Sequence, residues 1–89
     1  MSKFLCVHTV PPNKISREQV NQMARAAQSD AAVKGYRSFC SLSEGKMVCI
    51  LEAASKEAVT AWFKRMELPF DSISKLELEG DRGNIQACT

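Results

Sequence analysis

The side chains best suited to bind a transition metal or to act as a nucleophile are one histidine and four cysteines, and two of these lie together near the N-terminus. The segment FLCVHTV, residues 4–10, holds the only histidine, His8, two residues after Cys6. Three further cysteines are present: Cys40, Cys49 and Cys88. Imidazole, thiolate and carboxylate donors favour nickel, zinc or copper over magnesium or calcium. The sequence therefore offers donors for a transition-metal site, provided that the fold brings them together.

The same residues also have ordinary structural roles, which the sequence leaves open. Free cysteine packs as a small hydrophobe and is among the most buried residue types. An imidazole at a strand end can also simply bond a backbone carbonyl. One histidine per chain excludes a multi-histidine site within a protomer, so a metal would need thiolates, carboxylates, water or a partner chain. Cys6 and His8 stand about 6–7 Å apart along a strand, which disfavours a cysteine–histidine catalytic pair.

The composition limits the class of protein. With 89 residues, the chain is expected to form one domain over residues 1–83, followed by a polar tail over residues 84–89. A net charge of +2 and an aromatic content of 7% give no basic, aromatic surface of the kind that binds nucleic acid. The apolar run over residues 4–7 is too short for a signal peptide or a membrane span. We therefore expect a cytoplasmic protein with reduced thiols.

The spacing of apolar residues predicts four strands and two helices. We expect strands at residues 3–10, 36–42, 47–53 and 73–79, with helices at about residues 17–31 and from Ser55 to before Pro69. The order βαββαβ, with right-handed crossovers, predicts an α+β, ferredoxin-like antiparallel sheet of order 4-1-3-2 with both helices on one face. A copper chaperone of this fold needs a CxxC loop after the first strand, and PPNKIS stands there instead.

With a hairpin loop over residues 43–46, we expect Leu42 to pair with Met47 and Cys40 with Cys49. Alternation along the strands then sorts the side chains into two faces of the sheet. We expect one face to form the core beneath the helices: Leu5, Val7, Phe39, Val48, Ile50, Leu76 and Leu78. The opposite, open face would then hold Phe4, Cys6, His8, Tyr36, Ser38, Cys40, Leu42, Met47, Cys49, Leu51 and Glu77. Such an apolar open face is too large to leave in water. A second copy packed sheet against sheet, as a homodimeric α+β barrel, is the simplest cover.

Several segments together resemble a known family. KFLCVHTVPP, GYRSF, CILEA, LPFDSI and LELEG are similar to the corresponding parts of the small single-domain nickel-binding family, many of whose members are known only as a domain of unknown function. The resemblance reaches to about Gly83. It implies a ferredoxin-like homodimer that binds a divalent metal, nickel in the described case, near the inter-subunit sheet surfaces. By position it points first to His8, and then to Cys49 and Glu52.

The sequence thus predicts a homodimeric protein that holds a divalent transition metal, nickel preferred, for sequestration or sensing. The candidate metal ligands are these: His8, Cys6, Cys49, Cys40, Glu52 and Glu77. One alternative is a dimeric α+β barrel enzyme, similar to a monooxygenase or an isomerase, that acts on a small apolar substrate with His8 or Tyr36 as acid or base. Another is a non-catalytic module for protein interaction.

Overall fold

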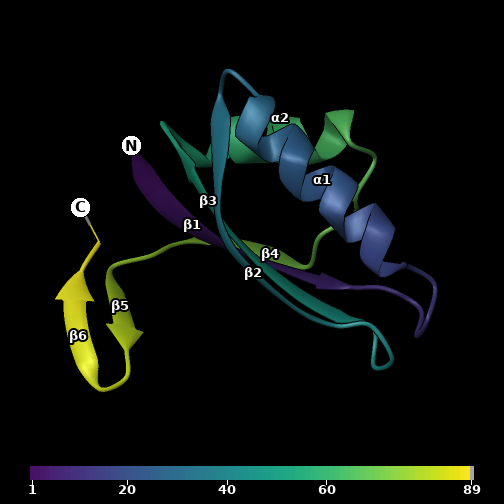
Figure 1. Cartoon of the computed structure of the whole chain (residues 1–89). Coiled ribbons are helices and arrows are strands. Elements are labelled where there is room, and N and C mark those ends of the chain that lie inside the picture. The colour runs from purple at the N-terminus through teal and green to yellow at the C-terminus, as the bar shows by residue number, and fades with distance from the viewer. Residues whose placement is uncertain (89) are drawn as a thin grey trace.

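The computed structural model describes residues 1–88 and contains two helices and six strands (Figure 1). In chain order the elements are β1 (Ser2–Thr9), α1 (Arg17–Ser29), β2 (Val33–Ser41), β3 (Lys46–Ala53), α2 (Lys56–Arg65), β4 (Ser72–Lys75), β5 (Leu78–Asp81) and β6 (Asn84–Ala87). The first four strands form one sheet of order β2-β3-β1-β4, and the last two form a separate hairpin. All pairings are antiparallel. The predicted α+β class, with two helices and antiparallel sheets, is confirmed.

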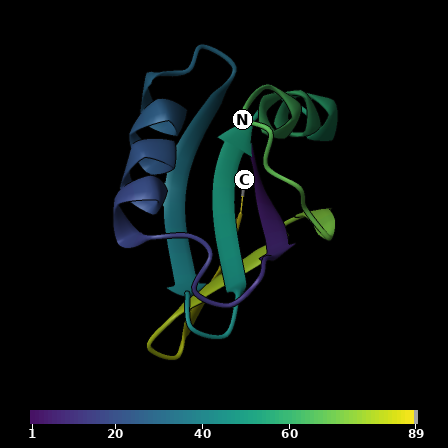
Figure 2. The ribbon, with the colours of Figure 1, turned by 90° about the vertical axis from the view of Figure 1, so that its right-hand side faces the viewer.

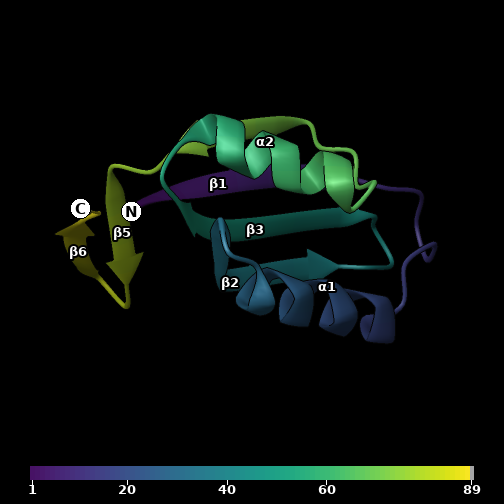
Figure 3. The same cartoon turned by 90° about the horizontal axis from the view of Figure 1, so that it is seen from above.

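Both helices begin where the sequence provides a cap. The Ser16 side chain accepts a hydrogen bond from the Gln19 backbone N–H, and the Gln19 side chain accepts one from the Ser16 backbone N–H, which forms a capping box at the start of α1. At the start of α2, the Ser55 side chain accepts a hydrogen bond from the Ala58 N–H. The two helices lie on one side of the four-stranded sheet (Figures 2 and 3).

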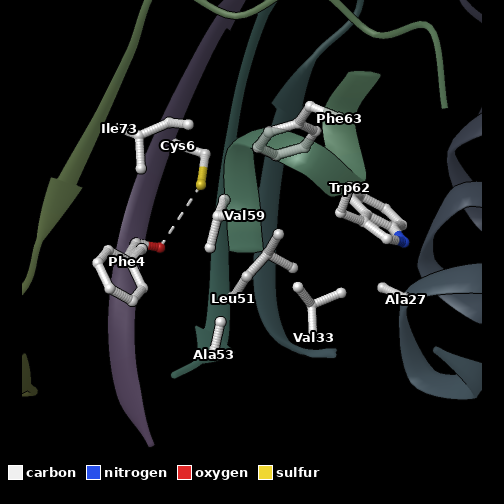
Figure 4. Close-up of a cluster of buried hydrophobic side chains, with 10 residues drawn as sticks. All are labelled: Phe4, Cys6, Ala27, Val33, Leu51, Ala53, Val59, Trp62, Phe63 and Ile73. Atoms are coloured by element: carbon white, nitrogen blue, oxygen red, sulfur yellow. Dashed lines mark hydrogen bonds between the residues drawn. The ribbon is translucent and has the colours of Figure 1, made fainter. Parts of the chain in front are cut away.

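The side of the sheet that faces the helices is opposite to the one predicted. The side chains of Phe4, Cys6 and His8 on β1 are buried, whereas Leu5 and Val7 are only half-buried. The core contains Val33, Leu51, Ala53, Val59, Trp62, Phe63 and Ile73, together with Phe4, Cys6 and Ala27 (Figure 4). The expected core position of Phe39 is also wrong, since its side chain is 53% exposed on the uncovered face.

The last predicted strand is interrupted. Ile73 in β4 pairs with Cys6 and faces the helices, so it takes the core place that was expected for Leu76 and Leu78. The strand β4 ends at Lys75, and Leu78 begins the β5–β6 hairpin with its side chain 64% exposed. Residues 84–87, expected to belong to a polar tail, form β6 of this hairpin. Figures 1 and 3 show the hairpin projecting beyond the end of the main sheet at which β1 begins.

The pairing of β2 with β3 differs by two residues from the expected register. Cys40 pairs with Met47 instead of Cys49, and Ser38 pairs with Cys49. A shift of two residues leaves each side chain on the same face as its expected neighbours. A bulge between Gly35 and Arg37 then sends Tyr36 to the uncovered face, where its hydroxyl donates to Glu79.

Candidate metal centre

His8 is completely buried beneath α2. Its ring packs edge-on against Phe63 of that helix, with ring centroids 4.8 Å apart. Across the sheet, its partner on β3 is Met47. His8 therefore lies on the helix side of the sheet, and not on the uncovered face where it was expected.

The backbone after α2 fixes the orientation of the His8 ring. At the end of α2 the chain turns through Glu67, whose φ is 56°, and the Asp71 N–H then bonds the Val7 carbonyl at 2.7 Å. This path places the Pro69 carbonyl oxygen 2.8 Å from His8 Nδ1. A carbonyl oxygen only accepts, so Nδ1 must carry the hydrogen that donates to it. In the neutral imidazole, Nε2 then presents its lone pair.

His8 Nε2 has no hydrogen-bond partner in the described residues 1–88, although it is buried. An unpaired buried polar atom costs about 1–3 kcal/mol, so such atoms in native proteins need an explanation. Metal-binding histidines commonly have this arrangement, because one ring N–H donates to a backbone carbonyl and leaves the other nitrogen to the metal. The residues present therefore fit one imidazole ligand.

Two of the predicted thiol ligands are neighbours of His8 on the same face. Cys6 and Cys49 stand directly opposite each other on β1 and β3, a position that places Cβ atoms about 4.5–5.5 Å apart. Burial, with a smaller contribution from the nearby Cys49, raises the pKa of the Cys6 thiol to about 12. The Cys6 thiol lies 3.7 Å from the Phe4 carbonyl oxygen, as Figure 4 shows. Burial also raises the pKa of Cys49, and the Ser38 hydroxyl partly opposes that shift.

The remaining predicted ligands are more distant in the sheet. Cys40 lies on the exposed edge strand β2, diagonal to Cys49. Glu52 belongs to the uncovered face, where it pairs with Lys3 on one side and Lys34 on the other. Glu77 is exposed in the link between β4 and β5. The fold thus keeps both carboxylates apart from His8 and from the two thiols next to it.

No three His, Cys, Asp or Glu side chains within residues 1–88 converge closely enough to hold a metal ion. Cys6, His8 and Cys49 are therefore neighbours on one face of the sheet, but their donor atoms do not converge on a common point. Sequence reasoning missed two groups that shape this place, the Pro69 carbonyl and the Phe63 ring. A backbone carbonyl has no signature in the sequence. Phe63 stands at helical spacing from Val59 and Met66, a pattern that predicts burial but not a contact with His8.

A cavity of about 250 Å³ opens beside this cluster, between α1, α2 and the sheet. Cys40, Met47 and Cys49 contribute to its floor, and Trp62 and Phe63 contribute from α2. His8 lies behind Met47 and Phe63 and does not line it.

None of the helices within residues 1–88 is long and apolar enough to cross a membrane.

Comparisons with known proteins assign the chain to a family. Residues 4–76 match the family described as nickel responsive protein SCO4226-like. The crystal structure of SCO4226 from Streptomyces coelicolor A3(2) resembles this chain with a TM-score of 0.74 and 24% identity, over 89% of this chain and 100% of the other, which shows a shared fold. A search of curated proteins found no match. Because the family match spans most of the sequence, the chain belongs to the SCO4226-like nickel responsive protein family.

Proposed function

We propose that this protein binds a divalent transition metal, nickel preferred, and serves in a nickel response by sequestration or sensing. The description of its family supports the nickel assignment. The observation that carries the proposal is the buried His8 Nε2, which has no partner in residues 1–88 while Nδ1 is held by the Pro69 carbonyl. The proposed site lies beneath α2, within one protomer.

Cys6 and Cys49 are the proposed thiolate ligands, because they share the helix side of the sheet with His8. Their side chains must rotate to complete the site, since they do not converge in this structure. Burial raises the pKa of both thiols, so metal binding has to displace their protons. Nickel affinity is therefore expected to fall as the pH is lowered.

Isothermal titration of the metal-free protein with nickel chloride tests the site. The wild type is expected to bind, and His8→Phe, which keeps an aromatic ring beside Phe63, is expected to lose at least tenfold in affinity. Glu52→Gln is the matched control and should bind like the wild type, because Glu52 is on the other face. No binding by the wild type, or equal binding by His8→Phe, would contradict the proposal.

We also propose that the protein is a ferredoxin-like homodimer that associates through the uncovered face of the sheet. Five apolar side chains of this face remain wholly or partly accessible to solvent: Leu5, Val7, Phe39, Val48 and Ile50. A second copy would remove this surface from water and extend a small core. The free thiols in the described residues fit a reducing compartment such as the cytoplasm.

A further inference from the structure

The cavity exists because the side chains of α1 do not fill the space between the two helices and the sheet. Two of the α1 side chains that line it, Ala24 and Ala27, are small, and Ala27 is the only buried residue of the helix. At Ala27 the helix comes close to β2, since a Cβ added at Gly35 would lie 3.6 Å from the Ala27 Cβ. In Figure 4 the Trp62 side chain extends from α2 toward Ala27. Elsewhere Val20, Met23 and Ala24 line the remaining space without filling it.

The lining of the cavity is mainly apolar and offers no charged group to a ligand. Tyr36 and Arg37 border it through β2, but their polar ends are engaged elsewhere. The Tyr36 hydroxyl donates to Glu79, and the Arg37 guanidinium lies 5.1 Å from the centroid of the Phe39 ring. The remaining polar groups are neutral: the Ser38 hydroxyl, the thiols of Cys40 and Cys49, and the Gln28 amide.

The volume suits a small organic molecule. An apolar cavity of about 150 Å³ holds benzene, and ligand sites usually measure about 300–1,000 Å³. At about 250 Å³, this cavity has room for a molecule somewhat larger than benzene. Ala24 and Gln28 line it and are exposed, so the cavity has a way in from solvent.

We propose that this cavity binds a neutral, mostly apolar molecule of the size of a substituted benzene or a small bicyclic aromatic. An ionised ligand is disfavoured, because a buried charge without a partner is costly. The site is separate from the proposed nickel function. Cys49 is common to both, but His8 does not line the cavity.

The four methionines allow a direct test. Met23 and Met47 line the cavity, whereas Met1 and Met66 do not. In protein labelled with ¹³C at the methionine methyl groups, titration with toluene is expected to shift the Met23 and Met47 signals saturably. The Met1 and Met66 signals should remain in place. Benzoate, which has a similar ring but carries a charge, is expected to bind at least tenfold more weakly.

Variants locate the bound molecule. Ala24→Phe places a ring in the cavity and should weaken toluene binding at least tenfold, while Ala61→Phe on the exposed side of α2 should not. Ala24→Leu is a smaller replacement if Ala24→Phe does not fold. Nickel titration of the Ala24 variant should match the wild type, which separates the two proposals. Absence of saturable shifts, equal binding of benzoate, or full affinity in the folded Ala24 variant would overturn the proposal.

Discussion

At the scale of single residues, His8 combines a structural and a chemical role. Its Nδ1 bonds the Pro69 carbonyl, which ties β1 to the segment after α2. Its Nε2 is left without a partner in the described residues, which packing alone does not explain. The sequence singled out His8 as the most distinctive residue. It could not give the ring orientation, because that depends on a carbonyl 61 residues away along the chain.

The raised pKa of the buried Cys6 thiol predicts how the stability of the protein depends on pH. Its pKa is about 12 in the folded protein, against 9.0 as the ordinary value. The unfolded chain therefore loses this proton first, and the stability that the neutral thiol contributes, complete below pH 9, is lost progressively as the pH rises toward 12. The free energy of unfolding should fall by up to about 1.4 kcal/mol per pH unit from this group.

Urea unfolding of reduced protein at several pH values between 7 and 10.5 measures this effect. Cys6→Ala removes the ionising thiol. The lysines and tyrosine ionise in both proteins, so their contributions cancel when the two are compared. The gap between wild type and Cys6→Ala is expected to narrow above pH 9. Parallel curves over the whole range would show that the buried thiol does not behave in this way.

At the scale of elements, alternation grouped the residues of β1 and β3 correctly but assigned the two groups to the wrong faces. Cys6, His8, Met47 and Cys49 do share one face, and Leu5, Val7, Val48 and Ile50 share the other. Both faces of β1 and β3 are apolar, so hydrophobicity did not show which one the helices cover. The expectation that Leu76 and Leu78 join Leu5 and Val7 in the core is wrong, because β4 ends at Lys75.

The turns of two hairpins, Gly45 between β2 and β3 and Gly83 between β5 and β6, offer a comparison of two glycines. Gly45 and Gly83 both have positive φ, at 71° and 84°, so an alanine at either place costs about 1–2 kcal/mol of backbone strain. At Gly45 the new Cβ would also lie 1.9 Å from the Val10 carbonyl oxygen, whereas at Gly83 nothing lies within 4 Å. Gly45→Ala is therefore expected to lose about 1–3 kcal/mol more than Gly83→Ala.

Urea unfolding of the two variants at pH 7 gives this difference directly. The backbone strain is similar in both, so the difference reports the collision with the loop after β1, where the Val10 N–H also bonds the Gly45 carbonyl. Equal losses in the two variants would mean that the turn rearranges to remove the collision.

At the scale of the whole molecule, the uncovered sheet face and the projecting hairpin both present apolar side chains to solvent. The hairpin is fixed to the sheet by an ion pair of 2.8 Å between Lys3 and Glu79, and the Lys3 ammonium lies 4.0 Å from the centroid of the Tyr36 ring. It also exposes Leu78 and Ile85. The class of the fold and its two helices followed from sequence periodicity. The hairpin did not, because its short strands are largely polar.

Substitution at Phe39 tests the proposed dimer. This side chain is 53% exposed at the uncovered face, so Phe39→Lys would place charges in the interface without disturbing the core. In sedimentation equilibrium the wild type is expected to have twice the mass of the chain, and Phe39→Lys the mass of one chain. Phe70→Lys, in the loop after α2, is the control and should remain dimeric. A monomeric wild type, or a dimeric Phe39→Lys, would contradict the interface.

In the proposed site His8 presents Nε2 to a metal, and the imidazole ¹⁵N spectrum reports on both ring nitrogens. Because the chain has one histidine, its two ring nitrogens are observed without overlap. In the metal-free protein, the neutral ring is predicted to carry its proton on Nδ1, which donates to the Pro69 carbonyl, and none on Nε2. On addition of nickel, or of diamagnetic zinc in parallel, the Nε2 signal should shift or broaden selectively while Nδ1 keeps its proton. A proton on Nε2 alone, or an unchanged Nε2 signal at saturating metal, would contradict the claim.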